Sequence, residues 1–166
     1  MAKAMADKEE LVLRPIGRVV RGPGYPLEEG WEEGIAELEI DAAWAGALEG
    51  IEEFSHIWLI WWLDRMGEPP ESLHVHPERR QELPEVGIFA TRSPHRPNPL
   101  ALTAVELLEH QGRRLRVRGL DACQGTPILD VKPYLRRGDL IPEATASDWL
   151  AKLWEIHDRE RAEARA

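Results

Sequence analysis

Apolar and polar residues alternate along the first third of the chain, which predicts β-structure. The segment 11–20 is rich in Leu, Val and Ile, and in IAELEID (35–41) an apolar side chain takes every second position, the period of a strand with one buried face. AAWAGALEG (42–50) then predicts one or two helical turns that end at Gly50. The run FSHIWLIWWL (54–63) is almost wholly apolar, so we expect a central strand that is buried on both faces.

The second half of the chain predicts further strands. VGIFATR (86–92) has the pattern of one strand. LTAVELLEH (102–110) and RLRVRGL (114–120) predict a hairpin that is joined through Gln111 and Gly112. A last strand is expected in PILDVKPYL (127–135), where Pro133 stops it because proline cannot donate to a sheet.

Two other segments are not strands. Residues 67–84 hold four of the thirteen prolines and little periodicity, so we expect an exposed excursion and no domain boundary. After Pro142, Thr145 or Ser147 can cap a helix and Asp148 favours its positive end. Side chains suited to one buried face recur there at helical spacing, at Trp149, Leu150, Leu153, Trp154 and His157.

Several strands at short spacing and few helices predict a mainly β protein, a single-sheeted antiparallel β-barrel with short peripheral helices and a C-terminal helix. At 166 residues the chain has the length of one domain. We expect the barrel over residues 11–140 and a helical extension of the same domain over residues 141–166. The Gly-x-Gly at 22–24 runs into Tyr-Pro instead of opening a helix, so the glycine-rich dinucleotide fingerprint is absent.

Composition narrows the class of protein. Forty-three per cent of the residues are hydrophobic and seven are tryptophan, so the chain can build a core without disulfides or a structural metal. Cys123 is the single cysteine and most simply fills a small buried space. The N-terminus shows no signal-peptide pattern, and the longest apolar run of ten residues is about half of the ~20 that a membrane span requires. We therefore expect a cytoplasmic protein with no membrane partner.

Charge is divided unevenly along the chain, whose net charge is −9. Residues 1–78 carry 6 Lys and Arg against 17 Asp and Glu, whereas residues 79–137 carry 11 against 6. The middle of the chain can therefore offer a basic patch to nucleic acid. For the arginines between 113 and 118, solvated strand faces are an equally good interpretation.

The segment ATRSPHRPNPLALT (90–103) is a candidate binding loop. It has three prolines and two arginines between Arg92 and Pro99. Proline drives the residue before it out of the α region, so Ser93, Arg96 and Asn98 are held extended with their side chains aimed. The alternative is a proline-stiffened surface loop without a ligand.

A second candidate is GLDACQGTPILDVKPYL (119–135). Gly125 permits close backbone approach, and Thr126 and the nearby carboxylates can bind hydroxyl or amine hydrogens. In the alternative, Asp121 and Asp130 accept turn amides and Lys132 pairs with one of them. A third candidate, His56 at the head of the apolar run, is more often a hydrogen-bonded core residue than a catalyst.

Together with EGIEEFSHIWLI and the opening PIGRVV, these segments resemble, in the same order and spacing, the signatures of the TsaA-like family, which includes the TrmO-type tRNA methyltransferases. The resemblance covers roughly residues 14 to 137. It implies a β-barrel that binds S-adenosylmethionine without a Rossmann domain, as a homodimer. It also implies methylation of the exocyclic nitrogen of threonylcarbamoyladenosine beside the anticodon, so that the partner is a tRNA anticodon loop.

The resemblance also implies roles for individual residues. The implied cofactor-binding residues are Asp64, Arg65, Arg92, Ser93, Leu102, Asp121, Gln124, Gly125, Thr126 and Pro127. Many relatives have an aromatic residue and a histidine in the 63–65 region and aspartate at the position of Gln124. The implied substrate-binding residues are Arg96, Asn98, Lys132 and Tyr134, and no metal is implied.

For catalysis we expect Asp121, His56 or water to take the proton of the accepting nitrogen. Arg92 completes the catalytic set, meeting with Arg96 a carboxylate of the ligand or a phosphate. The neutral carbonyls from Gly125 to Pro127 suit a sulfonium better than any arginine would. Ser93 lacks the elbow motif of a nucleophile.

Three alternatives stay open. The barrel can be a non-catalytic module that holds S-adenosylmethionine or RNA, or a methyltransferase for a different small or RNA substrate. A metal hydrolase is the third, with His74 and His76 on one face of a strand and His56 or His95 as a further ligand. Surface histidines of a proline-rich loop explain His74 and His76 better.

Overall fold

The computed structural model describes residues 11–24, 30–67 and 71–164. The chain divides into two compact units, which we describe separately. The barrel unit comprises Met1–Asp64 and Ala101–Tyr134, and the second unit comprises Arg65–Leu100 and Leu135–Ala166. The expected division at residue 140 stays a prediction.

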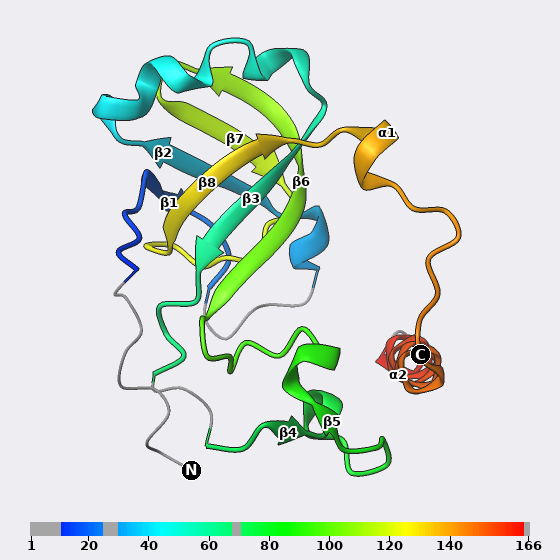
Figure 1. Ribbon diagram of the computed structural model, residues 1–166. Coiled ribbons are helices and arrows are strands. Elements are labelled where there is room, and N and C mark those ends of the chain that lie inside the picture. Colours follow the sequence, from blue (N-terminus) through cyan, green and yellow to red (C-terminus); the bar gives the residue numbers. More distant parts are fainter. Residues whose placement is uncertain (1–10, 25–29, 68–70, 165–166) are drawn as a thin grey trace. The chain divides into compact units, whose positions relative to one another are not determined.

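Six strands close a barrel in the order β1-β2-β7-β6-β3-β8 (Figure 1). Strand β1 pairs antiparallel with β2 and β8, β2 with β7, β7 with β6, and β8 with β3. The predicted mainly β barrel is therefore confirmed. The strands are β1 (Gly17–Arg21), β2 (Ile35–Ile40), β3 (His56–Trp62), β6 (Leu100–Gln111), β7 (Arg114–Arg118) and β8 (Pro127–Pro133).

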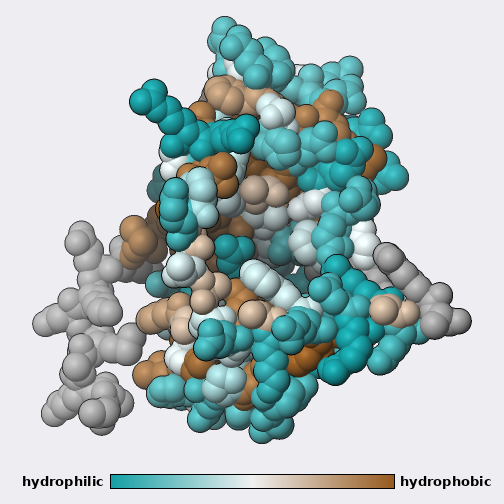
Figure 2. Space-filling model, turned by 90° about the vertical axis from the view of Figure 1, so that its right-hand side faces the viewer, coloured by the Kyte–Doolittle hydropathy of each residue, from teal (hydrophilic) through white to brown (hydrophobic). Residues whose placement is uncertain are grey.

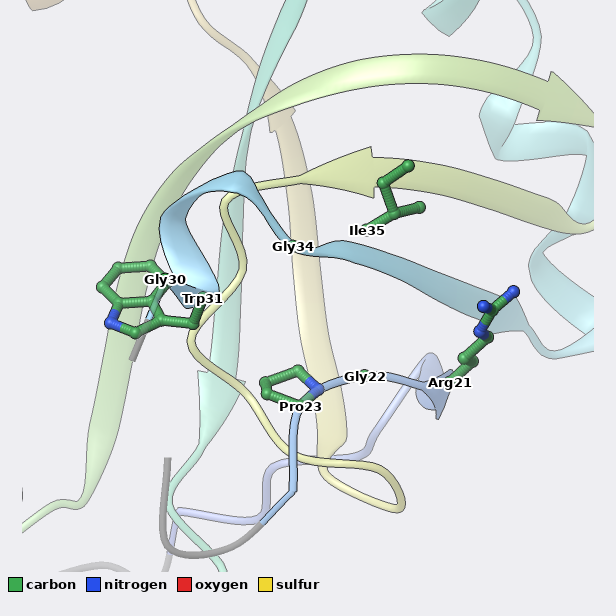
Figure 3. A pocket seen from close by; sticks show the side chains of 7 residues that line it. All are labelled: Arg21, Gly22, Pro23, Gly30, Trp31, Gly34 and Ile35. Carbon is green, nitrogen blue, oxygen red and sulfur yellow. The ribbon is translucent and has the colours of Figure 1, made fainter. Parts of the chain in front are cut away.

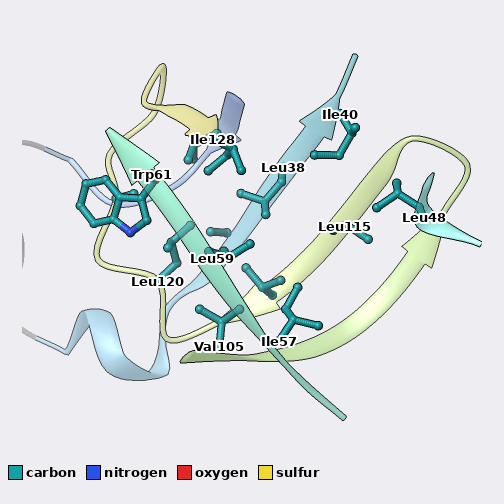
Figure 4. Close-up of a cluster of buried hydrophobic side chains, with 14 residues drawn as sticks. Leu38, Ile40, Leu48, Ile57, Leu59, Trp61, Val105, Leu115, Leu120 and Ile128 are labelled. Atoms are coloured by element: carbon teal, nitrogen blue, oxygen red, sulfur yellow. The ribbon is translucent and has the colours of Figure 1, made fainter. Parts of the chain in front are cut away.

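Side chains from all six strands meet inside the barrel (Figure 4). The two-residue period places every second side chain of a strand on this inner face, which removes branched aliphatic groups from water. The buried set is Val19, Ala36, Leu38, Ile40, Leu48, Ile57, Leu59, Trp61, Val105, Leu115, Val117, Leu120, Ala122 and Ile128.

Strand β3 differs from its prediction. Ile57, Leu59 and Trp61 are buried, but the residues between them are only partly buried, so the expectation of burial on both faces was wrong. The outer positions of β3 hold Trp58, Ile60 and Trp62, which look like core residues in the sequence. A large indole ring can leave part of its surface in water.

Other predicted boundaries shift by a few residues. The first strand begins at Gly17, not at residue 11, and the β6–β7 turn consists of Gly112 and Arg113, since Gln111 pairs with Arg114. Among its described residues, the barrel unit has three 3-10 helices, at Trp31–Glu33, Ala42–Leu48 and Ile51–Glu53. The helical turns predicted between 42 and 50 and the end of β8 at Pro133 are confirmed.

The second unit contains short elements and one long helix. Strands β4 (His74–Val75) and β5 (Val86–Gly87) pair antiparallel, and 3-10 helices lie at Pro77–Arg79 and Ile88–Ala90. Helix α1 spans Arg136–Asp139 and α2 spans Asp148–Ala164. The strand predicted for 86–92 was too long, because the chain turns into a 3-10 helix directly after Gly87.

Helix α2 and the loop 77–83 share a small apolar core, formed by buried Leu83, Leu153 and Ile156. Most residues that the structure describes in the expected exposed excursion over 67–84 are exposed, but Pro77 and Leu83 are buried and anchor it. Trp154 is 56% exposed, because it lies about 140° around the helix from Trp149 at 100° per residue.

Polar contacts also hold α2 to this loop. Arg80 Nη2 donates to Glu160 Oε2 at 2.8 Å, and His157 Nε2 lies 2.8 Å from Glu78 Oε2. The hydrogen bond from Arg80 holds the pKa of the Glu160 carboxyl below its usual range. A carboxyl whose pKa is depressed by folding stabilises the folded state above its unfolded pKa, and this contribution is lost as the pH falls.

In the described ranges of the chain, no helix has the length and apolar character that crossing a membrane requires.

Candidate functional site

Several predicted site residues gather at one end of the barrel, which we call the turn end. There β3 finishes and β8 begins, since Trp61 pairs with Ile128. Asp64 follows β3 by two residues, and the segment 119–126 leads into β8. The strand β6 contributes Leu102, which is 55% exposed, and Thr103.

The turn before β8 is fastened to β1. The amide of Gly125 donates to Val19 O at 2.8 Å, and the amide of Val19 donates to Thr126 O at 3.0 Å. Gly125 has a φ of 93°, which an L side chain rarely adopts. A Cβ there would meet nothing within 4 Å, so the backbone at Gly125 faces open space that a ligand can enter.

Two polar side chains flank this turn. Thr126 is only 2% exposed, and its Oγ1 lies 3.5 Å from Asp64 Oδ1 as a donor. Asp64 is exposed, and Gln124, which directly precedes Gly125, is exposed as well. Carboxylates of this kind accept hydrogens from the hydroxyl and amino groups of a nucleoside cofactor.

Asp121 is held by a chain of hydrogen bonds. Trp61, which is 5% exposed, donates from Nε1 to Thr103 Oγ1 at 3.2 Å. The Thr103 hydroxyl donates to Asp121 Oδ1 at 2.6 Å. Since a hydroxyl has one hydrogen, the indole of Trp61 directs that hydrogen to the carboxylate. Thr103 and Trp61 were not singled out in the sequence, where only the inward parity of position 103 on its strand could have indicated them.

Replacing Thr103 by valine is expected to lower the free energy of unfolding by about 1–3 kcal/mol, because it leaves two partly buried polar groups without their partner. Denaturant unfolding measures the loss. Thr103→Ser keeps the hydroxyl and serves as the control with the smaller loss. A valine variant as stable as the wild type would contradict this account of the hydrogen-bond chain.

Three other predicted residues lie at the opposite end of β3. His56 begins that strand, and Ile57 pairs with Pro133 beside Tyr134. The His56 and Tyr134 rings have centroids 6.4 Å apart, and Lys132 Nζ lies 2.7 Å from Asp130 Oδ2. Six residues of strand span about 20 Å, so His56 and Tyr134 lie about that far along the sheet from the turn end, and Lys132, which pairs with Trp58, lies between them and that end.

This separation bears on two of the alternatives that the sequence left open. His56 and Asp121 lie toward opposite ends of β3, and the assignment of either one as proton acceptor stays a prediction. For the segment 119–135, the ion pair between Lys132 and Asp130 agrees with the alternative in which Lys132 has a structural partner. Asp121 accepts a hydrogen bond from the Thr103 hydroxyl.

The remaining predicted residues belong to the second unit, namely Arg65, Arg92, Ser93, Arg96 and Asn98. In the proline-rich loop, the Ser93 amide donates to Thr91 Oγ1 at 3.1 Å, and Asn98 O accepts the amide of Leu100 at 2.7 Å. Arg92 is exposed. The loop therefore has a defined conformation that presents the Arg92 side chain to solvent.

The Arg96 side chain stabilises this loop by hydrogen bonds to its backbone carbonyl groups. Its Nη1 donates to Thr91 O at 2.9 Å and to Ser93 O at 3.3 Å. Its guanidinium carbon lies 5.6 Å from the centre of the Phe89 ring. These contacts give Arg96 a structural role. Its predicted role in binding the substrate stays a prediction.

The arginines of β7 and the preceding turn form ion pairs. Arg113 Nη2 lies 2.8 Å and Arg114 Nη2 3.6 Å from the carboxylate of Glu39. Arg116 pairs with Glu109 and Arg118 with Glu106. The interpretation as strand faces in solvent therefore explains these arginines, since nearby carboxylates balance their charge.

Over the ranges that the structure describes, no three His, Cys, Asp or Glu side chains form a group that could hold a metal ion. His76 Nδ1 lies 2.8 Å from Leu83 O, so this ring has a structural partner inside the second unit.

Comparison with known proteins identifies a family and several relatives. Residues 22–140 match the family described as tRNA-methyltransferase O N-terminal domain. A probable S-adenosyl-L-methionine-binding protein of Archaeoglobus fulgidus is 41% identical over 80% of this chain and 36% of its own length. A tRNA (adenine(37)-N6)-methyltransferase of Mus musculus is 40% identical over 54% of this chain and 20% of its own.

Among solved structures, the crystal structure of TrmO from Pseudomonas aeruginosa superposes with a TM-score of 0.65 and 27% identity. The match covers 84% of this chain and 63% of that one. The chain therefore spans less than two thirds of each of these three proteins.

Proposed function

Because this chain belongs to the family of tRNA-methyltransferase O N-terminal domains, as its sequence predicted, we propose that it transfers the methyl group of S-adenosylmethionine to an adenosine of tRNA. The names of the mouse and archaeal relatives support the reaction and the cofactor. The observation that carries the proposal is the position of the Asp121 carboxylate. A hydrogen bond from Thr103 holds it at the end of the barrel where the Gly125 backbone faces open space.

The residues of the turn end fit the cofactor by their chemistry. Asp64 and Gln124 offer polar atoms for hydroxyl and amino groups, and Leu102 offers an exposed apolar surface. The carbonyls from Gly125 to Pro127 offer partial negative charge without a counter-ion. When bound, S-adenosylmethionine supplies an electrophilic methyl group on a positively charged sulfur.

Asp121 is the proton acceptor in this proposal. Thr103 already donates to Oδ1, and we assign the proton of the accepting nitrogen to the other oxygen of the carboxylate. Loss of that proton frees the lone pair of the nitrogen to attack, while the barrel holds the two reacting groups in contact. His56 has no part in this step, since it lies at the other end of β3.

For the nucleoside that accepts the methyl group, we propose threonylcarbamoyladenosine beside the anticodon. A base in a single-stranded loop can be turned into a pocket at the cost of its stacking alone. Arg92, exposed on the proline-rich loop, is our candidate for the threonyl carboxylate or a phosphate. Polar residues cover much of the surface in the view of Figure 2.

Because the chain has a net charge of −9, the salt dependence of tRNA binding tests whether basic residues of the protein contact the phosphates of the RNA. Binding of modified tRNA is expected to weaken at least tenfold when salt rises from 50 to 200 mM, because each phosphate contact releases counter-ions. Filter binding or fluorescence anisotropy at four salt concentrations gives the slope. Affinity that does not change with salt would point to a small-molecule substrate.

Two parts of the expected picture stay predictions: the homodimer and the cytoplasmic location. Analytical ultracentrifugation with and without tRNA tests the first of these.

The reaction is tested with tRNA from cells that lack the modification and S-adenosylmethionine carrying an isotopically labelled methyl group. Mass spectrometry of the nucleosides is expected to find the label on the exocyclic nitrogen of threonylcarbamoyladenosine. Label on another nucleoside would contradict the finer assignment only. Unlabelled RNA together with measurable cofactor binding would identify a binding module instead of an enzyme.

A further inference from the structure

A hollow of about 280 Å³ lies in the barrel unit, outside the group of residues described above. It opens between the end of β1 and the start of β2 (Figure 3). Figure 3 shows Trp31 at one side of the hollow and Arg21 at the other, with Pro23 and Gly34 between them. The lining residues are Arg21, Gly22, Pro23, Gly30, Trp31, Gly34 and Ile35.

The walls of the hollow adjoin the segment that carries Asp121. A Cβ on Gly22 would lie 2.9 Å from Ala122 O, so only glycine lets the β1 end pack this closely on that segment. The amide of Gly119 donates to Gly34 O at 3.1 Å, which fixes the opposite wall. The hollow therefore belongs to the turn end, where its walls contact the backbone on either side of Asp121.

Its lining has two chemically distinct sides. Trp31 is partly buried and presents an indole ring at one side. Pro23 adds apolar surface between the two sides, and Ile35 adds it on the Arg21 side (Figure 3). The Arg21 side chain is 71% exposed and meets Glu37 only at 3.4 Å, a long contact that a competing anion can replace. A flat heteroaromatic ring linked to an anionic group matches this division, since bases stack on indole rings and guanidinium groups bind phosphate or carboxylate.

We propose that this hollow binds a purine base stacked on Trp31, with its attached anionic group at Arg21. The proposal rests on the proposed function and adds two binding residues to it, Trp31 and Arg21. Two sources can supply this chemistry: the adenosine of the cofactor, with its amino-acid carboxylate, and a nucleotide of the RNA substrate, with its phosphate. The place of the hollow at the turn end is compatible with either source, and affinities of single variants distinguish them.

The test uses the full chain with Trp31→Ala and Trp31→Phe. Trp44→Ala is the matched control, because Trp44 is 50% exposed and follows β2 where Trp31 precedes it. Calorimetry measures affinity for S-adenosylhomocysteine, and anisotropy measures affinity for a labelled anticodon stem-loop. Removing the stacking ring is expected to weaken one of the two affinities about tenfold, while Phe restores it to within about threefold.

The ligand that loses affinity identifies the source. Weaker binding of S-adenosylhomocysteine assigns the hollow to the cofactor, and weaker binding of the stem-loop alone assigns it to RNA. Ile35→Trp fills the hollow from its other wall and is expected to weaken the same ligand, which covers the case in which Trp31→Ala does not fold.

The inference is overturned if both affinities of folded Trp31→Ala and Ile35→Trp stay within twofold of the wild type, or if Trp44→Ala loses as much. Its failure is distinct from failure of the proposed function. Wild-type protein that binds neither ligand contradicts the function itself, whereas variants that bind and methylate normally contradict only the role of the hollow.

Discussion

Replacing Asp121 by asparagine is expected to slow methyl transfer to tRNA by about 100-fold or more, because a positioned general base typically contributes ~10²–10⁴ to a rate. The amide keeps an oxygen that can accept the Thr103 hydroxyl, now 2.6 Å from Asp121 Oδ1. Folding and cofactor affinity should therefore change little. Single-turnover rates at saturating cofactor, measured with calorimetric affinities for S-adenosylhomocysteine, separate the chemical step from binding.

Glu109→Gln is the control for this variant. Glu109 is an exposed carboxylate on β6 that lies 3.8 Å from Arg116, and its neutralisation should leave the rate within about twofold. Asp121→Asn turnover within fivefold of the wild type would remove Asp121 from the role of proton acceptor and leave water as the acceptor.

Replacing Leu59 by alanine is expected to lower the free energy of unfolding by about 2–5 kcal/mol. Leu59 is 0% exposed and lies in the middle of β3, where its side chain fills the barrel interior (Figure 4). The truncation removes apolar contacts and leaves a cavity that the closed sheet cannot collapse around. Denaturant unfolding followed by tryptophan fluorescence gives the change.

Leu11→Ala makes the same chemical change at a side chain that is 82% exposed, and its effect should stay within about 0.5 kcal/mol. If the free energy of unfolding fell equally in Leu59→Ala and Leu11→Ala, the Leu59 side chain would not be part of the barrel core.

The barrel could be predicted from the chain because its strands alternate. In β2, Ala36, Leu38 and Ile40 are buried and the residues between them are not, as the pattern indicates. The prediction that β3 is buried on both faces failed because the tryptophans at positions 58 and 62 are apolar and yet partly exposed. The loop 77–83 misled for another reason: its buried Leu83 packs on α2, about seventy residues later in the chain, and no local pattern reports such a contact.

The site could be predicted only in part. The turn at Gly125 and the carboxylate of Asp121 were recognisable from their motif, and the structure places them at one barrel end. The hydrogen bond from Thr103 to Asp121 joins two strands, and the separation of His56 from Asp121 follows from the direction of β3. Both depend on strand order, which the residue pattern does not contain. The hollow beside Trp31 likewise depends on how β1 and β2 diverge.

The central claim is that the S-adenosyl cofactor binds at the turn end of the barrel. Titrating isotopically labelled protein with S-adenosylhomocysteine, and following backbone amide signals by NMR, tests it most directly. The amides of Gly125 and Thr126 are expected to shift, while that of Tyr134, at the far end of β8, stays in place. Shifts confined to the His56 and Tyr134 end, or no shifts at all at saturating ligand, would contradict the account.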